Sequence, residues 1–216
     1  TIDSNIQSIV EKHLAQAVED YKCESGITIA MDPSTGKILA MADYPSYDCN
    51  DKNTPNSHLA KNWDSLSSED KSKSLYRMWT PKAVTDTYEP GSVFKIVTSA
   101  IALEENVVDT DTVNFNCNGA YYVQGESRPI KCHKYPSSHG AESLRLALEN
   151  SCNPAFVELG LKIGKERSYK YYEALGFFGK TGISLLGEPK NGGIFYDIDK
   201  IKPHELGTMS FGQRFT

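Results

Sequence analysis

The chain of 216 residues lacks any hydrophobic run close to the ~18 residues that a membrane-spanning helix requires, and its N-terminus shows no basic-then-apolar signal peptide pattern. An excess of basic charge is also missing, because 23 Lys and Arg stand against 28 Asp and Glu for a net charge of -5. That balance argues against nucleic acid or anionic lipid as the main partner. Since the first residue is Thr1 rather than Met, we expect a processed or shortened chain.

Internal repeats and low-complexity tracts are absent as well. The hydrophobic share of 39% and the charged share of 24% are typical of globular proteins. A chain of this length can bury a core without the help of disulfides or metals. The five cysteines are an odd number, so they cannot all pair within the chain.

The hydrophobic pattern predicts a helix-rich α+β protein with a short N-terminal β-hairpin. The first helix is expected over residues 4–21, where Ser4 and Gln7 have the form of a capping box. Apolar stretches at 27–31 and 38–42, joined by turn-forming residues, predict the hairpin. Since a lone hairpin is marginally stable, helices must pack against it.

Further along, residues 92–105 are apolar nearly all round and predict a buried helix. The polar region 43–80 predicts a surface excursion with a helical turn or two. The Gly-rich region 176–216 predicts loops around short elements. Three more helices are predicted over residues 143–149, 154–163 and 166–175.

The segment from Glu89 to Lys95 is the most informative for chemistry. Pro90 and Gly91 break the chain just before the buried helix, so Ser92 is expected in its first turn. Lys95 lies on the same face, about 5–6 Å away at Cβ. Burial lowers the pKa of a lysine, and a neutral amine can take the proton of a serine nucleophile. The alternative, an ordinary helix start with a Ser cap and a solvent-reaching Lys, is favoured for S-x-x-K alone.

A second motif, Ser151-Cys152-Asn153, begins 56 residues beyond Lys95. S-x-x-K followed by an S-x-N-type motif is typical of penicillin-binding proteins and related β-lactamases. The chain resembles class B penicillin-binding proteins, the monofunctional D,D-transpeptidases of peptidoglycan synthesis, and within them the sporulation-specific type or its elongation-type clostridial relative. The matching stretches run in family order: Thr1-Ile2-Asp3 with Gln7, Met31-Asp32-Pro33, Gly36 to Met41, Tyr44-Pro45 to Asn50, Glu89 to Lys95, His139-Gly140, Ser151 to Pro154, Thr181-Gly182-Ile183, Gly187-Glu188 and Ser210-Phe211-Gly212-Gln213.

The resemblance implies a truncated transpeptidase fold and a role for each motif residue. Ser92 would attack the carbonyl between the last two D-alanines of a stem peptide, with Lys95 as the general base. Ser151 would relay a proton to the leaving amine, and Asn153 would orient the substrate and the lysine. β-Lactam antibiotics would acylate the same Ser92.

The resemblance also implies partners and a location. The substrate would be a peptidoglycan stem peptide ending in D-Ala-D-Ala, and the full-length protein would work with a lipid II glycosyltransferase. We expect that protein to be anchored in the cell membrane with this domain on the extracytoplasmic face. Its role would lie in spore cortex, septal or elongation wall synthesis.

The K-T-G triplet at residues 180–182 is not interpreted as a catalytic motif. Lys180-Thr181-Gly182 spells the family's third motif, K-T-G, but the following residues resemble a separate family loop. The true K-T-G strand is expected well beyond residue 213. Residues 1–216 are therefore predicted to be the N-terminal part of a transpeptidase domain, and to acylate poorly without that strand.

Cys117, Cys132, His139 and Cys152 form a possible metal site. No pair has C-x-x-C spacing, so a disulfide or buried thiols are alternatives. The neighbours of Cys152 are expected to face the active site, which leaves its own side chain to point elsewhere. Clostridial relatives carry zinc near this position, so the resemblance implies a structural Zn²⁺ site. His133 is a rival fourth ligand.

Two other functions remain open at this stage. A class D-like β-lactamase or β-lactam sensor also uses S-x-x-K, although no deacylating base is evident. A catalytically inactive, zinc-stabilised scaffold fragment is the non-enzymatic alternative.

Overall fold

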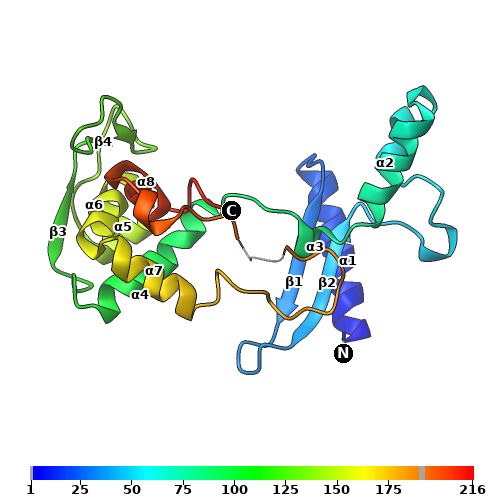
Figure 1. Cartoon of the computed structure of the whole chain (residues 1–216), viewed down its shortest axis with the longest axis horizontal. Helices are drawn as coiled ribbons and strands as arrows, with labels where there is room; N and C mark the ends of the chain where they lie inside the picture. Colours follow the sequence, from blue (N-terminus) through cyan, green and yellow to red (C-terminus); the bar gives the residue numbers. More distant parts are fainter. Residues whose placement is uncertain (1, 190–192) are drawn as a thin grey trace. The chain divides into compact units, whose positions relative to one another are not determined.

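The computed structural model describes residues 2–189 and 193–216. These residues form two units, one of residues 2–86 with 182–189 and the other of residues 87–181 with 193–216 (Figure 1). The predicted mixture of helices with a short N-terminal hairpin is confirmed. Within the described part of the chain, no helix is both long and apolar enough to cross a membrane.

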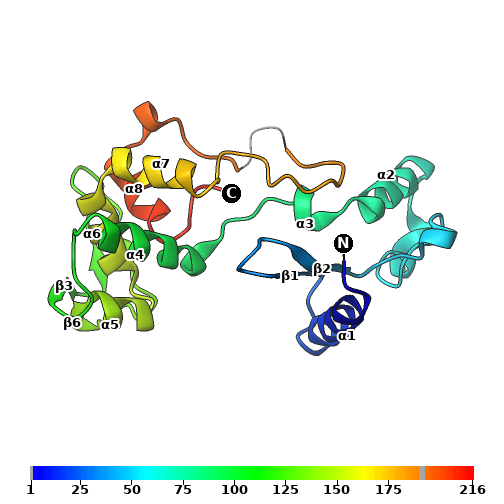
Figure 2. The same ribbon diagram turned by 90° about the horizontal axis from the view of Figure 1, so that it is seen from below.

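The first unit is built on a helix and a hairpin. Strands β1 (Gly26–Met31) and β2 (Ile38–Tyr44) pair antiparallel, and α1 (Ser4–Asp20) runs along one face of the pair (Figure 2). The packing is close, since a Cβ on Gly26 would lie 2.7 Å from Leu14 and 2.8 Å from Val18. The hairpin and the first helix are therefore as predicted.

The predicted capping box of α1 is wrong. The N-cap is Asp3, whose carboxylate accepts hydrogen bonds from the backbone N–H groups of Asn5 and Ile6. The Gln7 side chain instead bonds to both the N–H and the carbonyl of Met41, at 2.8 Å each. Gln7 thus joins the helix to β2.

The region between the hairpin and the nucleophile segment is more helical than predicted. It contains 3-10 turns η1 (Cys49–Asp51) and η2 (Leu59–Ser65), then helices α2 (Ser68–Trp79) and α3 (Lys82–Thr85). The expectation of a helical turn or two is wrong because α2 extends over 12 residues. Met78 of α2 is buried and Lys71, Ser74, Leu75 and Trp79 are half-buried at helical spacing, but two of these five are polar, so the apolar pattern in the sequence covers only the end of the helix.

The second unit surrounds α6 (Asn153–Ile163), of which seven residues are buried. A short 3-10 turn η3 (Gly91–Phe94) leads into α4 (Lys95–Glu104). The prediction that this helix is buried holds for one face only, because Ile96 and Leu103 are exposed. The other elements are β3 (Val113–Cys117), β4 (Ala120–Tyr121), β5 (Ile130–Lys131), β6 (Gly140–Ser143), α5 (Leu144–Glu149), α7 (Lys165–Ala174), η4 (Ile198–Lys200) and α8 (Pro203–Met209). Strand β3 pairs with β6, and β4 pairs with β5.

Helices α5, α6 and α7 lie within two residues of their predicted bounds. Helix α8, which packs on α6, is one of the short elements expected among the loops of residues 176–216. Its last four residues are all buried, so it shows no apolar–polar period. Residues 190–192 of the predicted loop region lie outside the described residues.

Candidate active site and metal centre

Ser92 and Lys95 lie where η3 passes into α4. The α-helix begins at Lys95, so Ser92 stands in the preceding 3-10 turn rather than in the first α-helical turn as predicted. Ser92 is exposed, whereas Lys95 is completely buried, and the Lys95 Nζ donates to Ser92 Oγ at 3.1 Å. Between them, the Phe94 ring packs edge-on against Tyr172 and Phe215, with centroids 5.4 and 4.7 Å away.

The same lysine reaches the second motif. Its Nζ donates to the Ser151 carbonyl oxygen at 2.8 Å, to Ser151 Oγ at 2.9 Å and to Asn153 Oδ1 at 2.8 Å. The Ser151 hydroxyl donates to Ser92 Oγ at 3.0 Å. The structure therefore brings all four predicted catalytic residues into one hydrogen-bonded group.

The turn that carries the second motif has an unusual backbone. Ser151 lies between α5 and α6 with a φ of 47°, in the left-handed region that non-glycine residues rarely adopt. In this conformation both its carbonyl and its hydroxyl contact Lys95. Asn153 is held from its other end, because its Nδ2 donates to the Lys131 carbonyl at 3.3 Å. Such strain persists only where several contacts hold it, as they do here.

Aromatic rings enclose the amine. The Lys95 Nζ lies 5.3 Å from the centroid of Phe156 and 5.8 Å from that of Phe211, and both residues are buried. Burial lowers the pKa of Lys95 to about 8. About a tenth of the amine is therefore neutral at pH 7.

The backbone just before Ser92 is held by residues 209–214, which we call the SFGQ turn. The Gly91 N–H donates to the Gly212 carbonyl at 2.8 Å, and the Arg214 N–H donates to Glu89 Oε1 at 2.7 Å. Gly212 has a φ of +81°, and a Cβ there would overlap the Gly91 carbonyl oxygen and lie 2.7 Å from its nitrogen. The SFGQ turn thus fixes Glu89 and Gly91, which precede Ser92.

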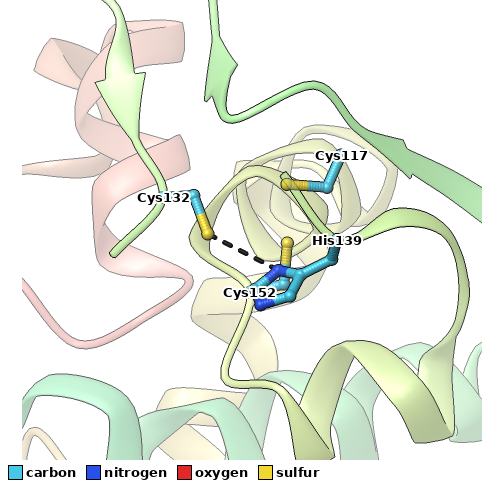
Figure 3. Close-up of side chains that lie close together, drawn as sticks. All are labelled: Cys117, Cys132, His139 and Cys152. Carbon is cyan, nitrogen blue, oxygen red and sulfur yellow. Dashed lines mark hydrogen bonds between the residues drawn. The ribbon is translucent and has the colours of Figure 1, made fainter. Parts of the chain in front are cut away.

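Three thiols and one imidazole converge beside the turn that carries Ser151 and Asn153 (Figure 3). Cys117 ends β3, Cys132 follows β5, His139 precedes β6 and Cys152 precedes α6. Their ligand atoms all lie within 4.8 Å of one another, and Cys132 Sγ is 3.5 Å from His139 Nδ1. All five cysteines are free thiols, with Cys23 and Cys49 exposed. The predicted set of residues is therefore assembled, with no disulfide among them.

The donor set fits a zinc ion. Three sulfurs and one imidazole nitrogen are a common tetrahedral set, in which Zn–S bonds of about 2.3 Å place sulfurs roughly 3.8 Å apart. Small side-chain rotations would close the observed spacing. Burial raises the pKa of the Cys152 thiol, as does the neighbouring Glu142 carboxylate, so without a cation the proton stays on sulfur. His133, the predicted rival, is exposed and lies outside the converging group.

A family model described as "Penicillin binding protein transpeptidase domain" matches residues 26–212. The chain belongs to this transpeptidase family. Stage V sporulation protein D of Bacillus subtilis (strain 168) is 38% identical over 99% of the chain and 29% of its own length. The "probable peptidoglycan D,D-transpeptidase PenA" of Neisseria gonorrhoeae is 30% identical over 98% of the chain and 32% of its own length. The chain thus spans about a third of the length of these curated relatives.

Two solved structures share the fold. A putative peptidoglycan glycosyltransferase from Atopobium parvulum has a TM-score of 0.78 and 28% identity over the whole chain and 44% of its own. Penicillin-binding protein 3 of Mycobacterium tuberculosis, complexed with aztreonam, has a TM-score of 0.76 and 24% identity over the whole chain and 43% of its own. The predicted transpeptidase fold is therefore confirmed.

Within this penicillin-binding transpeptidase chain, residues 180–182 form exposed coil and belong to no strand, which agrees with the refusal of the K-T-G triplet as a catalytic motif. Two functional contacts were missed by sequence reasoning, the Lys131 carbonyl that holds Asn153 and the Gly212 carbonyl that holds Gly91. Every residue has a backbone carbonyl, so residue type does not predict these contacts. Gly212 was the one sequence signal available, because a glycine permits a close approach of two backbones.

Proposed function

We propose that the chain carries the acylation site of a serine-type peptidoglycan D,D-transpeptidase. The observation that supports this most is a single buried amine, Lys95 Nζ, in contact with Ser92 on one side and with Ser151 and Asn153 on the other. A relative that carries the name D,D-transpeptidase aligns over 98% of the chain. The family match favours this function over a class D-like β-lactamase.

The hydrogen bonds around Lys95 suit a general base. The Ser151 carbonyl and Asn153 Oδ1 can only accept, so they use the two N–H bonds of a neutral amine. The lone pair is left for a hydroxyl proton, and Ser92 Oγ is 3.1 Å away. Ser92 Oγ attacks the carbonyl carbon of the penultimate D-alanine while its proton passes to Lys95. The Ser92 N–H supplies one donor to the oxyanion that forms.

Ser151 provides the proton for the leaving group. Its hydroxyl lies 2.9 Å from Lys95 Nζ and 3.0 Å from Ser92 Oγ. As the peptide C–N bond breaks, Ser151 gives its proton to the D-alanine nitrogen and receives one from Lys95. D-Alanine departs and an ester remains on Ser92. The amine of a second stem peptide then displaces Ser92 and forms the cross-link.

The same serine is the proposed target of β-lactams. A relative in the fold comparison was solved with aztreonam bound. In the full-length protein, a fluorescent penicillin should form one stable adduct, located on Ser92 by mass spectrometry. Ser92→Ala should abolish it, while replacement of the exposed Ser138 by Ala should leave it intact. An adduct that survives Ser92→Ala, or none in the unaltered protein, would refute the assignment. Steady turnover of a chromogenic cephalosporin would indicate a β-lactamase instead.

A structural Zn²⁺ held by Cys117, Cys132, His139 and Cys152 is the second part of the proposal. When bound, the ion ties together segments that carry catalytic groups. Cys152 stands between Ser151 and Asn153, and Cys132 follows the residue whose carbonyl accepts from Asn153. Protein purified without chelator should contain one zinc per chain by elemental analysis. Metal-free protein that takes up no zinc would exclude the site.

We further propose a role in wall synthesis during sporulation, supported by the 38% identity to a stage V sporulation protein. Because stem peptides lie outside the cytoplasm, the domain would act on the extracytoplasmic face of the membrane beside a lipid II glycosyltransferase. Deletion of the gene should reduce heat-resistant spores and spare vegetative growth. Loss of vegetative growth would contradict the sporulation role while leaving the enzymatic one.

A further inference from the structure

A buried serine at the end of α8 takes no direct part in the proposed acyl transfer. Ser210 directly follows α8 and is 2% exposed. Its Oγ lies 2.6 Å from the carbonyl oxygens of Phe156 and Gly207, so its one proton is shared between an acceptor on α6 and one on α8. Its own carbonyl oxygen accepts from Thr98 Oγ1 of α4 at 2.7 Å. Ser210 therefore has hydrogen bonds to two helices that are distant from it in the sequence.

Each of these hydrogen bonds lies about one helical turn from a catalytic residue. Helix α4 begins at Lys95, and Thr98 is three residues further along it. Helix α6 begins at Asn153, and Phe156 is three residues further along it. The Lys95 Nζ and Asn153 Oδ1 are 2.8 Å apart. The Ser210 bridge, by which we mean the hydrogen bonds that join Thr98, Ser210 and Phe156, therefore connects the two helix starts whose side chains must meet.

The Ser210 bridge is closely packed and shielded from water. Thr98 and Ser210 are each 2% exposed, and hydrogen bonds in such a buried environment are stronger than in water. A Cβ on Gly160 of α6 would lie only 2.6 Å from the Ser210 Cβ. Because glycine has no Cβ, Ser210 can approach the α6 backbone this closely. The position of Ser210 against α6 is therefore restricted by packing as well as by hydrogen bonds.

The same bridge adjoins both rings that enclose the amine. Phe156 provides the carbonyl that accepts from Ser210 Oγ, and Phe211 is the next residue in the chain. The ring centroids of these two residues lie 5.3 and 5.8 Å from Lys95 Nζ. A displacement of Ser210 would therefore move the aromatic walls around Lys95 as well as the two helix starts.

We propose that Ser210 is a positioning residue for the acylation step. Through the Ser210 bridge it sets the spacing between the start of α4, which carries Lys95, and the start of α6, which carries Asn153. This inference rests on the proposed transpeptidase function and adds to it a residue that does not touch the reacting atoms. A misplacement of about 1 Å in a catalytic group can reduce a rate roughly 100-fold, so loss of the bridge should slow acylation about 10–100-fold.

The test is the rate of penicillin acylation of the full-length protein, measured over a range of penicillin concentrations. Thr98→Val keeps the side-chain shape and removes the hydroxyl, so the limiting rate should fall about 10–100-fold while the half-saturating concentration stays the same. Thr98→Ser keeps the hydroxyl and should retain the limiting rate of the unaltered protein. A loss in Thr98→Ser as large as that in Thr98→Val would refute a role for the hydrogen bond.

Thr208→Val is the matched control. Thr208 is buried, and its hydroxyl donates to the carbonyls of His204 and Glu205, which belong to its own helix α8. The substitution removes the same kind of hydrogen bond two residues before Ser210 and spares the bridge to α4 and α6. Its limiting acylation rate should equal that of the unaltered protein. An equal loss of rate in Thr208→Val and Thr98→Val would indicate a general structural effect and would overturn the inference.

A double-mutant cycle tests whether the two hydrogen bonds act as one bridge. Ser210→Ala removes the bond to α6 and should lower the limiting rate as Thr98→Val does. Because the two bonds lie in series, Thr98→Val should cause little further loss in the Ser210→Ala background. Losses that multiply in the double variant, or an unchanged rate in Thr98→Val, would overturn the inference and leave the proposed function standing.

Two further outcomes are also decisive. If Ser210→Ala fails to fold, the comparison of Thr98→Val, Thr98→Ser and Thr208→Val decides the question without it. An unaltered full-length protein that forms no penicillin adduct would refute the transpeptidase function, and this inference with it.

Discussion

The contact between Gly91 and Gly212 allows a specific prediction about stability. Both partners are main-chain atoms, so neither can relieve a steric clash by a side-chain rotation. In Gly212→Ala, the new Cβ would overlap the Gly91 carbonyl oxygen. The left-handed φ of +81° alone costs an L-residue about 1–2 kcal/mol. Overpacking against fixed backbone adds roughly 1–3 kcal/mol. We expect a total loss of about 2–5 kcal/mol in the free energy of unfolding.

Gly176→Ala is the matched control. Gly176 belongs to the same unit and has a φ of +83°, but a Cβ there would meet nothing within 4 Å. It should therefore show the φ penalty alone, about 1–2 kcal/mol. Urea unfolding of both variants, followed by circular dichroism, measures the difference. Because Gly91 adjoins Ser92, Gly212→Ala should also slow penicillin acylation of the full-length protein more than Gly176→Ala. Equal losses of stability in the two variants would refute the steric argument.

Three further predictions use other parts of the chain. The pKa of Lys95 is lowered to about 8, and the neutral amine is the base. The acylation rate of the full-length protein should therefore increase about tenfold per pH unit below pH 8 and level off above it. An acylation rate that stays constant from about pH 6 to 9 would contradict this role. Asp3→Ala should destabilise the first unit by about 1 kcal/mol in urea unfolding, because Asp3 is the N-cap, whereas Ser4→Ala should cost less than about 0.5 kcal/mol. A larger loss in Ser4→Ala than in Asp3→Ala would instead indicate that Ser4 is the N-cap. Zinc chelation should increase amide hydrogen exchange around Cys152 and leave α1 unchanged, and uniform protection with and without chelator would argue against a structural ion.

The sequence predicted the catalytic group well because its chemistry is concentrated in two short motifs. Ser92 and Lys95 share one turn of backbone, and Ser151 and Asn153 share another, so only the meeting of the two turns had to come from the fold. The cysteines were harder, because their spacing has no recognisable period and convergence depends on two small sheets. The SFGQ turn could not be derived, since Glu89 and Arg214 are 125 positions apart and meet through a backbone N–H.

Secondary structure was under-predicted in α2. Its buried and half-buried positions recur at helical spacing, but Lys71 and Ser74 among them are polar, so the apolar pattern is confined to Leu75, Met78 and Trp79 near the end of the helix. The N-cap was misplaced by one residue for a different reason. Gln7 has the right type for a capping box, but β2 offers it two backbone partners at once.

The left-handed Ser151 turn affects how this site would respond to side-chain mutagenesis. Lys95 receives two contacts from Ser151, and one of them is to the main-chain carbonyl. Replacement of the serine by alanine deletes the hydroxyl and keeps that carbonyl. Side-chain mutagenesis would therefore report only the contribution of the Ser151 hydroxyl. The contribution of the carbonyl would be measured by a backbone change, such as an amide-to-ester exchange at the 151–152 linkage, which weakens the carbonyl as a hydrogen-bond acceptor.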